Sequence, residues 1–386
     1  MKILQVIPTV EPSVGGVAPA MRALSRGLVR RGHSVEIVAL DPPTAPWLQE
    51  IDLPIHAVGP GLTSYGYSSD FDRWLETQGR KYDRVIVNGM WQYPGLAVWR
   101  RFAGSKTPYY VFTHGMLDPW FKRTYPLKHL KKWLYWPWAE YRVLRDAAAV
   151  IFTSEQERVE ARQSFWLYRA RERVSPLGVE RPASGSAVTA DLLPENFPQL
   201  RGTRSLLFLG RLHPKKGCDL AIDAFAAVLR DRRDISLVFS GPDQIGWKPE
   251  LERRARDLGV ESRVVFTGML QGELKHSALI NADALILPSH QENFGMAVAE
   301  ALAAGVPALI SDRINISSEI AADRAGYVAS DDLAGTTSLL QRWVDTPETD
   351  KEIMRSNARN CFTNRYEIER AVDSLLKILE ESADVS

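Results

Sequence analysis

Short apolar runs alternate with segments of helical periodicity along this chain, in two successive series. The first series has runs at 3–7, 35–40, 84–88, 109–113 and 150–153, and the second has runs at 205–209, 236–240, 264–267, 284–288 and 307–311. Short apolar runs that alternate with helices are typical of buried strands in a parallel sheet with helices on both faces. Two such series in a chain of 386 residues predict two α/β domains in tandem.

A segment without periodicity separates the two series. Residues 181–204 are rich in Pro, Gly, Ala and Ser, which is typical of a linker. We therefore expect an N-terminal domain over 1–182 and a C-terminal domain over 183–364. The segment 365–386 contains apolar residues at helical spacing between Ile368 and Leu379, and we expect a helix there.

The bulk composition excludes several classes of protein. A formal net charge of +1 gives no general attraction to nucleic acid. The two cysteines, Cys218 and Cys361, form no C-x-x-C pair, and such sparse use of cysteine fits a reducing compartment. The first ten residues are too short for a signal peptide, and no uncharged apolar run is long enough to span a bilayer. We expect a cytoplasmic protein, or one bound peripherally to the inner face of the plasma membrane.

A cationic loop follows the predicted strand at 205–209. Arg211, Lys215 and Lys216 lie between this strand and a predicted helix over 217–230. Cations at the carboxyl end of a strand, beside the N-terminus of a helix, make a favourable diphosphate site. The alternative is a solvated basic turn. The loop matches neither a Walker A motif nor G-x-G-x-x-G.

Two carboxylates, Glu292 and Glu300, stand eight positions apart after the predicted strand at 284–288. We expect Asn293 to cap a helix over 294–304, with Glu292 in the loop and Glu300 almost two turns inside. Such carboxylates could accept hydrogen bonds from sugar and ribose hydroxyls. The alternative is a pair of surface glutamates, but Glu300 stands among apolar residues, and a buried carboxylate needs a partner.

Four segments resemble one known family, the retaining GT-B glycosyltransferases of family 4. QENFGMAVAEALAAGVPAL at 291–309 resembles the family's E-x7-E motif, and FLGRLHPKKGCDLAIDAF at 208–225 resembles its phosphate-binding segment. VGGVAPAMRALSRGLVRRGHSVEIV at 14–38 resembles its N-terminal glycine loop and first helix. FTHGMLDPW at 112–120 resembles a His-containing segment of bacterial polysaccharide transferases. The four segments occur in the family's order, and the resemblance extends over nearly the whole chain.

The resemblance implies a fold and a reaction. The fold is GT-B, with two Rossmann-like domains whose parallel sheets face each other across a cleft. The N-terminal domain would bind the acceptor, the C-terminal domain would bind the nucleotide sugar, and the helix in 365–386 would pack back on the N-terminal domain. The reaction is transfer of a sugar, with retention, from a nucleotide-diphosphate sugar to a glycan or lipid-linked glycan in cell-surface polysaccharide synthesis. No cofactor and no metal are expected.

The resemblance also implies roles for individual residues. Arg211 and Lys216 would neutralise the departing diphosphate, Glu292 would bind hydroxyls of the donor sugar, and His114 would lie near that sugar. A histidine at a strand end can also be an ordinary core residue. Glu300 would hold the ribose. The donor-binding residues implied are Gly15, Gly16, Gly268, Met269, Asn293, Phe294, Gly295 and Glu300.

The sequence is also compatible with other functions. A sugar-nucleotide epimerase of GT-B architecture would change the donor without an acceptor, and a non-catalytic protein would only bind nucleotide sugar or glycan. A metal-dependent GT-A enzyme needs an Asp-x-Asp motif, which Asp70-Phe71-Asp72 matches literally, in a polar segment that no predicted strand precedes.

A basic and aromatic strip spans 120–145. It contains seven Lys or Arg, eight aromatic residues and one acidic residue, Glu140. Such a strip could bind an anionic membrane surface, could bind single-stranded nucleic acid, or could pack its aromatic residues into the N-terminal domain. Nothing else in the sequence favours nucleic acid. The partners we expect are a UDP- or GDP-sugar, a glycan or lipid-linked acceptor, and an anionic membrane surface.

Overall fold

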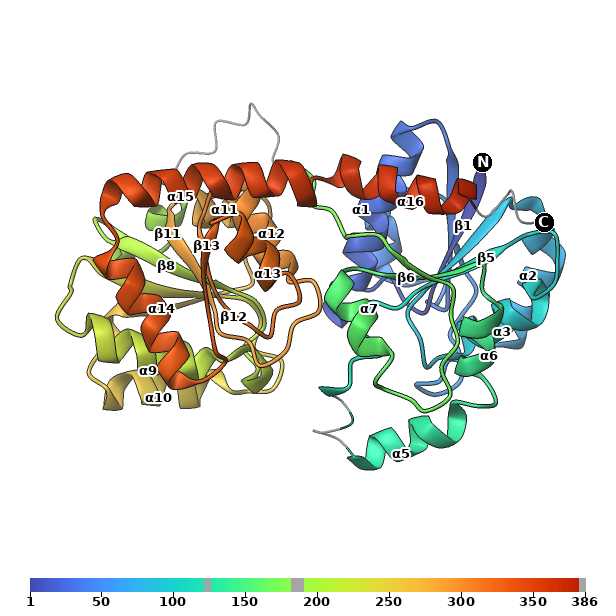
Figure 1. The fold of residues 1–386 in the computed structure, drawn as a ribbon, viewed down its shortest axis with the longest axis horizontal. Helices are drawn as coiled ribbons and strands as arrows, with labels where there is room; N and C mark the ends of the chain where they lie inside the picture. Colours follow the sequence, from blue (N-terminus) through green and yellow to red (C-terminus); the bar gives the residue numbers. More distant parts are fainter. Residues whose placement is uncertain (121, 123–125, 182–190, 382–386) are drawn as a thin grey trace. The chain divides into compact units, whose positions relative to one another are not determined.

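The computed structural model describes residues 1–120, 122, 126–181 and 191–381, and it divides the chain into two compact units (Figure 1). Unit 1 comprises Met1–Gly178 and Ile368–Ser386, and unit 2 comprises Val179–Glu367. The first boundary lies four residues before the expected 182, and the second lies three residues after the expected 364.

Unit 1 is built on a parallel sheet of seven strands in the order β3-β2-β1-β4-β5-β6-β7. Successive residues of a strand point to opposite faces. Val38 therefore belongs to one apolar cluster, with Leu4 and Val98, and Ile37 belongs to another, with Met21. The strands are β1 (Lys2–Ile7), β2 (Ser34–Ala39), β3 (Ile55–Ala57), β4 (Arg84–Asn88), β5 (Tyr109–Phe112), β6 (Ala149–Phe152) and β7 (Glu172–Val174).

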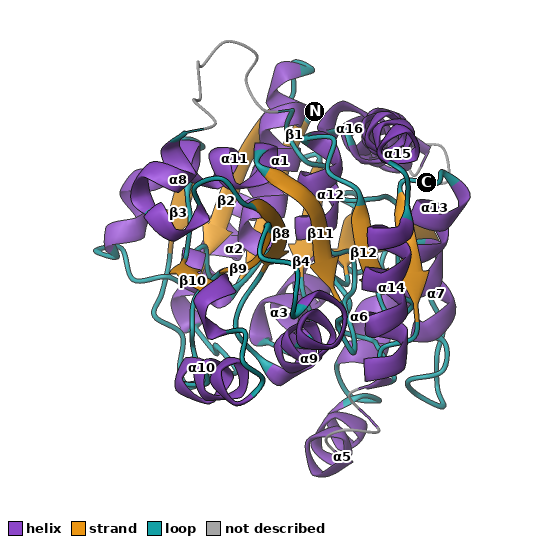
Figure 2. Ribbon diagram, turned by 90° about the vertical axis from the view of Figure 1, so that its left-hand side faces the viewer, coloured by secondary structure: helices purple, strands orange, loops and turns teal. Residues whose placement is uncertain are grey.

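Helices cover both faces of this sheet (Figure 2). They are α1 (Val17–Arg30), α2 (Ser69–Gln78), α3 (Tyr93–Phe102), α5 (Pro126–Tyr135), α6 (Glu140–Asp146), α7 (Glu155–Ala161) and α16 (Ile368–Glu381).

The last helix, α16, packs on α1, so the end of the chain belongs to unit 1 (Figure 1). The crossing is close because Gly27 has no side chain: a Cβ atom there would lie 2.3 Å from Cγ2 of Val372. Arg30, the last residue of α1, and Arg31, its C-cap, contact the carboxylate of Glu369 at 3.0 and 3.2 Å. Packing and charge together fix α16 against the first helix.

Unit 2 is a parallel sheet of six strands in the order β10-β9-β8-β11-β12-β13. The strands are β8 (Arg204–Leu209), β9 (Ile235–Ser240), β10 (Val264–Gly268), β11 (Ala282–Leu287), β12 (Ala308–Ser311) and β13 (Gly326–Ala329). The helices are α8 (Leu192–Asn196), α9 (Cys218–Leu229), α10 (Lys248–Asp257), α11 (Gly272–Ile280), α12 (Met296–Ala303), α13 (Ser317–Ala322), α14 (Leu333–Asp345) and α15 (Glu348–Cys361). The strand order changes direction between β8 and β11, which is where such sheets bind ligands.

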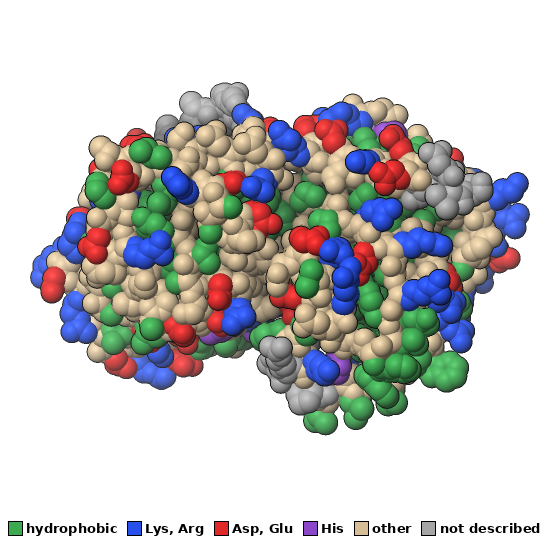
Figure 3. Space-filling model, in the orientation of Figure 1, with side chains coloured by type: hydrophobic (Ala, Val, Ile, Leu, Met, Phe, Trp, Pro, Cys, Tyr) green, Lys and Arg blue, Asp and Glu red, His purple; other side chains and the backbone are tan. Residues whose placement is uncertain are grey.

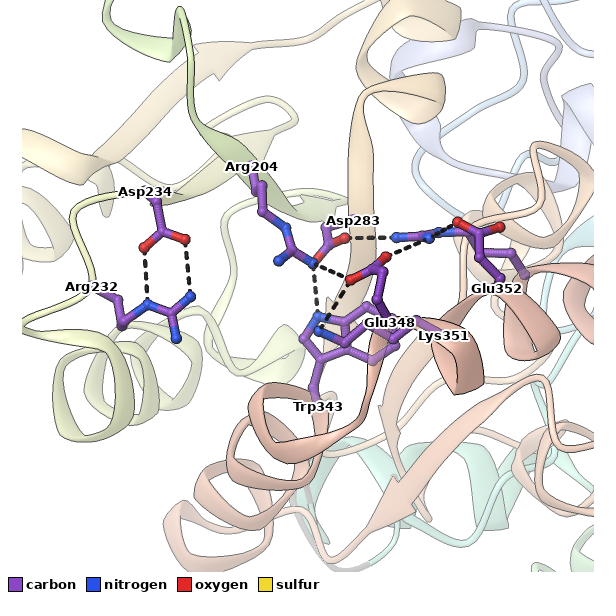
Figure 4. A network of polar contacts seen from close by, with 9 residues as sticks. Arg204, Arg232, Asp234, Asp283, Trp343, Glu348, Lys351 and Glu352 are labelled. Atoms are coloured by element: carbon purple, nitrogen blue, oxygen red, sulfur yellow. Dashed lines mark hydrogen bonds and ion pairs between the residues drawn. The ribbon is translucent and has the colours of Figure 1, made fainter.

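A buried carboxylate ties two helices to this sheet (Figure 4). Asp283, near the start of β11, accepts hydrogen bonds from Arg204 at 2.7 Å, from Trp343 of α14 at 2.9 Å and from Arg355 of α15 at 2.8 Å. A buried carboxylate is stable only when it is paired and hydrogen-bonded, and three donors meet that need here.

The two tandem α/β domains predicted from the sequence are confirmed, and each predicted strand exists within two residues of its expected ends. The strands β3, β7 and β13 were not predicted. They are short strands at sheet edges, so their residues lack a long apolar run. Among the described residues, no helix combines the length and the apolar character needed to cross a bilayer.

Candidate active site

The polar residues predicted in unit 2 gather at the carboxyl ends of two neighbouring strands. The loop 210–217 follows β8, and the loop 288–295 follows β11. Because β8 and β11 are hydrogen-bonded to each other at the point where the strand order reverses, both loops emerge at one edge of the sheet. The sequence places cations on the first loop and carboxylates on and after the second.

A glycine allows the two loops to meet. Gly217 has φ 68°, and a Cβ atom there would lie 2.3 Å from the carbonyl oxygen of Pro288. The backbone N–H of His290, on the second loop, donates to the carbonyl of Lys215, on the first, at 2.9 Å. His213 begins the short 3₁₀ turn Pro214–Lys216, and its Nδ1 accepts the N–H of Lys215 at 3.1 Å. Backbone contacts therefore fix where the cations stand.

The central contact of the site joins Lys216 to Glu292. The ammonium of Lys216 lies directly against the carboxylate of Glu292, and both side chains are largely buried. Burial, with the positive charges of Lys215 and Arg211, lowers the pKa of Lys216. The Glu292 carboxylate acts in the opposite direction because an adjacent negative charge favours the ammonium form. The structure thus brings together a cation and a carboxylate that stand 76 positions apart.

Arg211 lies at the solvent-exposed side of this loop. Its Nη1 donates to Oε1 of Gln244 at 2.9 Å. Burial and the charges of Arg211, Lys215 and Lys216 lower the pKa of His213, which favours the neutral imidazole. The loop therefore carries an exposed Arg211 and the Lys216–Glu292 pair, with His213 as a structural cap.

Backbone pairing fixes the position of Glu292. Its N–H donates to the carbonyl of Arg313 at 3.0 Å, and its carbonyl accepts the N–H of Asn315 at 3.1 Å. The Asn315 side chain also donates to Oδ1 of Asn293 at 3.3 Å. The residues 292 and 293 are thus held like a short strand beside the segment after β12.

The expected start of the next helix is wrong by two residues. The helix α12 begins at Met296 and its N-cap is Gly295, with φ 74°, so Asn293 does not cap it. A left-handed conformation is far more accessible to Gly than to Asn, and Asn293 instead pairs with Asn315. Glu300 consequently lies just over one turn into the helix, not almost two. Phe294 is buried, with its ring edge-on to Tyr366 at 5.6 Å.

Glu300 has a partner that the sequence did not indicate. Its Oε2 lies 2.8 Å from Nζ of Lys275 on α11, and both side chains are partly exposed. The helix α11 follows the segment that contains Gly268 and Met269. Gly268 ends β10 with φ 73° and its carbonyl accepts the N–H of Gly241, whereas the Met269 side chain is exposed. Glu300 and Lys275 therefore form an accessible ion pair between two helices.

Gly15 and Gly16 lie at the start of α1 in unit 1. Gly15 has φ 142°, Gly16 is the N-cap of the helix, and a Cβ atom at either would meet no atom within 4 Å. The first N–H groups of an α-helix have no partner inside the helix, which favours anions at this end. The open backbone of these two glycines permits such an approach.

His114 is a neutral, hydrogen-bonded histidine at the end of β5. Its Nε2 lies 3.2 Å from Oδ1 of Asn88, whose amide donates to Gln5 at 2.8 Å, so Nε2 carries the proton. Burial lowers the pKa of His114 to about 3. The ring stacks on Phe112, and the buried Nδ1 lone pair has no hydrogen-bond partner among the described residues. His114 is thus held in one tautomer with an unused acceptor.

A buried glutamate fixes the loop that carries His114. The carboxylate of Glu157 accepts the N–H of Gly115 at 2.6 Å and the hydroxyl of Thr113 at 2.5 Å, on both sides of His114. It also accepts the N–H and the hydroxyl of Thr153 at 2.7 and 2.6 Å. His114 has φ 49°, which costs free energy for a side chain of this kind, and the four donors to Glu157 offset it.

The structure groups the predicted residues into two sets. Arg211, Lys216, Glu292, Glu300 and the Gly268–Met269 segment belong to unit 2, and Gly15, Gly16 and His114 belong to unit 1. Sequence reasoning missed Lys275, Gln244, Asn88 and Glu157, which are single polar residues outside any motif.

No group of three or more His, Cys, Asp or Glu side chains suited to a metal ion occurs in the described ranges. The Asp70-Phe71-Asp72 sequence lies in the first turn of α2. There Asp70 pairs with Arg73, and Asp72 accepts the hydroxyl of Tyr93.

Comparisons with known proteins agree with this geometry. Residues 195–361 match the family model of glycosyl transferases group 1, and residues 15–178 match that of the glycosyl transferase 4-like domain. An alpha-D-kanosaminyltransferase of Streptomyces kanamyceticus is 28% identical over 251 residues, which is 63% of this chain and 63% of that protein. The matched region thus spans less than two thirds of that relative.

A second relative aligns over almost the full length. The GDP-mannose-dependent alpha-(1-6)-phosphatidylinositol dimannoside mannosyltransferase of Mycobacterium tuberculosis is 26% identical over 98% of this chain and 96% of its own. The crystal structure of Anabaena HepE in complex with UDP and glucose has a TM-score of 0.77 at 17% identity, covering 99% of this chain and all of that one. With its two matched models and its two Rossmann-like units, the chain belongs to the family 4 glycosyltransferases of GT-B architecture.

Proposed function

We propose that this protein transfers a sugar from a nucleotide-diphosphate sugar to a glycan or lipid-linked glycan, with retention of anomeric configuration, in cell-surface polysaccharide synthesis. The observation that carries the proposal is the juxtaposition of Lys216 with Glu292, and of Arg211 on the same loop, at the carboxyl ends of β8 and β11. A diphosphate needs cations and a sugar needs hydrogen-bond acceptors, and this edge of the sheet supplies both.

In this proposal the fixed charges act on the leaving group. The bond between the anomeric carbon and the diphosphate oxygen breaks, and Arg211 and Lys216 stabilise the negative charge that develops on that oxygen. The acceptor oxygen bonds to the anomeric carbon on the same face, and its proton passes to the departing phosphate oxygen. Because these two cations supply the charge, we propose that the reaction uses no metal and no cofactor.

The remaining residues of unit 2 orient the donor. Glu292 binds hydroxyls of the sugar, and Lys216 turns from Glu292 toward the diphosphate when the donor arrives. Glu300 accepts hydrogen bonds from the ribose hydroxyls, and the backbone at Gly268 and Met269 contacts the base. The N-terminal amides of α12, opened by Gly295, add donors near the sugar or phosphate.

In unit 1 we propose that the start of α1, at Gly15 and Gly16, approaches the phosphates. His114 acts near the donor sugar, where its Nδ1 lone pair accepts a hydrogen bond from a sugar hydroxyl, because Nε2 is already committed to Asn88. A neutral imidazole with one free acceptor can orient a hydroxyl. It carries no positive charge, so the stabilisation of the diphosphate is left to Arg211 and Lys216.

The relatives support the proposed donor and acceptor classes. One relative is named for GDP-mannose and a phosphatidylinositol glycolipid, and one solved structure of this fold contains UDP and glucose. We propose a UDP- or GDP-sugar as donor, a cytoplasmic location and a peripheral position on the inner face of the plasma membrane. The two cysteines are buried and unpaired, which fits a reducing compartment.

The experiment that tests this proposal measures thermal stabilisation and hydrolysis of UDP-, GDP-, ADP- and dTDP-sugars, with and without EDTA. Selective stabilisation by one nucleotide that is unaffected by EDTA supports a metal-independent transferase. The anomer released at early times, read by NMR, then tests retention. Conversion of the donor to its epimer would instead identify an epimerase, and binding of a glycan without any nucleotide effect would identify a binding protein.

A further inference from the structure

One face of unit 1 exposes large apolar side chains over the helix α5. On this helix Leu127, Leu130 and Leu134 are spaced as on one helical face, and they are 82%, 55% and 63% exposed. Trp138 and Trp166 nearby are 71% and 67% exposed. Figure 3 shows hydrophobic side chains gathered over α5 at the lower edge of this unit. Clustered exposed apolar groups of this size mark an interaction site more often than an ordinary surface.

The opposite face of α5 is firmly attached to unit 1, so the exposed leucines do not result from a loose helix. His129 stacks on Phe165 with ring centroids 4.9 Å apart, and Trp136 stacks on the same ring at 4.1 Å. The hydroxyl of Tyr135 lies 2.7 Å from that of Tyr65. The helix therefore presents its apolar face outward from a fixed base.

The same surface is basic. Lys122 and Lys131 are exposed here, and the next carboxylate after them in the chain, Glu140, is buried. An open pocket of about 630 Å³ lies between α5 and the loop after α7. Its lining includes Lys122, His129, Trp133, Arg162, Phe165 and Trp166. The rings of Trp133 and Trp166 are 6.1 Å apart, so aromatic side chains and cations stand together at the pocket.

We propose that this surface, formed by α5 with Trp138 and Trp166, binds an anionic lipid bilayer, with the leucines in the interfacial region and the basic pocket at the level of the phosphate headgroups. An amphipathic helix with exposed Leu and Trp on one side and Lys or Arg beside them has the composition that lies in a membrane interface. Negative headgroups complement the exposed cations Lys122 and Lys131. This inference rests on the proposed function, because it identifies the surface at which the protein would reach a lipid-linked acceptor in the bilayer.

A second copy of the chain fits this surface less well. In a two-fold dimer each patch faces its own equivalent, so the exposed Lys122 and Lys131 of one copy would be placed against the same cations of the other. A bilayer with anionic headgroups accepts the apolar and the basic parts of the surface together.

The test is co-sedimentation of the full chain with phosphatidylcholine vesicles and with vesicles that also contain phosphatidylglycerol. We expect binding to rise with phosphatidylglycerol and to fall with added salt. Leu130→Asp with Leu134→Asp should weaken the vesicle affinity by about tenfold or more, because two apolar side chains no longer enter the interface. Lys131→Glu should weaken it by about tenfold. Ile353→Asp, at an exposed apolar residue of α15, is the matched control and should leave binding unchanged.

Hydrolysis of a water-soluble nucleotide sugar without vesicles is measured on the same samples. Wild-type hydrolysis in the Leu130→Asp, Leu134→Asp variant, with lost vesicle binding, supports the inference. Equal vesicle binding by this variant and the wild type overturns it. The inference is also overturned if the vesicle binding of the wild type does not change with phosphatidylglycerol. It is overturned as well if the wild type is a dimer in solution and the two substitutions dissociate it. Loss of hydrolysis in the wild type with vesicle binding intact would instead contradict the proposed function alone.

Discussion

Nζ of Lys275 lies 2.8 Å from Oε2 of Glu300, and this ion pair joins α11 to α12. We assign Glu300 to the ribose. The positive charge of Lys275 therefore offsets the negative charge of a carboxylate close to where an anionic nucleotide would bind. Both side chains are partly exposed, and the strength of the pair is limited by solvent.

Lys275→Gln should raise the donor KM with little change in kcat, because Lys275 is not assigned to the reacting atoms. Removing a partly exposed partner typically costs about 0.2–1 kcal/mol, so we expect KM to rise by a factor of roughly 1.4 to 5. Steady-state kinetics at varied donor concentration measures this. Lys377→Gln, which removes an exposed lysine of α16, is the control. A lower KM in Lys275→Gln would show that the lysine competes with the ribose instead.

Arg211→Ala and Lys216→Met should each reduce turnover far more than they destabilise the fold. Loss of one fixed donor to a developing negative charge typically lowers the rate on the order of 10²–10³-fold. Turnover and urea unfolding are measured on the same preparations. Wild-type turnover in either variant would remove that residue from the mechanism. The Lys216→Met variant should be paired with Glu292→Gln, because the lone Glu292 carboxylate would otherwise remain partly buried without its cation.

Glu140 should make the stability of the protein depend on pH. Burial raises its pKa to about 7, although the N–H of Trp91 at 2.6 Å and the charge of Lys132 favour the ionised form. Its unfolded pKa is near 4.3. The folded state therefore holds this proton more tightly, so its contribution to stability is present at low pH and is lost as pH rises from the unfolded value through about 7.

Urea unfolding at several pH values between 4.5 and 8 checks this prediction on the wild type and on Glu140→Gln. The substitution keeps an acceptor for Trp91 and removes the titration. The wild type should lose stability relative to the variant by roughly 2–3 kcal/mol over this interval. Parallel curves for the two proteins would show that Glu140 does not titrate in this range.

Asp283→Asn should destabilise unit 2 without affecting donor binding. Asp283 holds Arg204, Trp343 and Arg355 near the start of β11 (Figure 4). The candidate site follows the other end of this strand. Loss of one partner from a buried ion pair costs about 3–5 kcal/mol. Asp234→Asn is a matched control, because its pair with Arg232 is half exposed; it should change stability by less than about 1 kcal/mol. Equal unfolding midpoints for both variants would contradict the assigned role.

The sequence predicts the fold well because apolar runs are local signals. The ten predicted strands exist, and the predicted helix over 217–230 differs from α9 by one residue at each end. The edge strands β3 and β7 were not predicted, and none of their residues is buried. The start of α12 was misplaced because Asn is a common cap in general, whereas the backbone here takes a left-handed turn at Gly295.

Only those residues of the site that lie in a recognisable motif could be predicted from the sequence. Glu292 and Lys216 were each found from their own segments, and their direct contact follows from the adjacency of β8 and β11. Lys275, Asn88 and Glu157 could not be found, because each acts through a partner far along the chain or through a backbone conformation that no spacing reveals.

The most direct test of the central claim, that unit 2 binds a nucleotide diphosphate through Arg211 and Lys216, is isothermal titration of the full chain with UDP and with GDP. The wild type should bind one of them, the Arg211→Ala, Lys216→Met double variant should lose most of that affinity, and Lys377→Met should bind like the wild type. No binding of either nucleotide by the wild type, or equal binding by the double variant, would contradict the account.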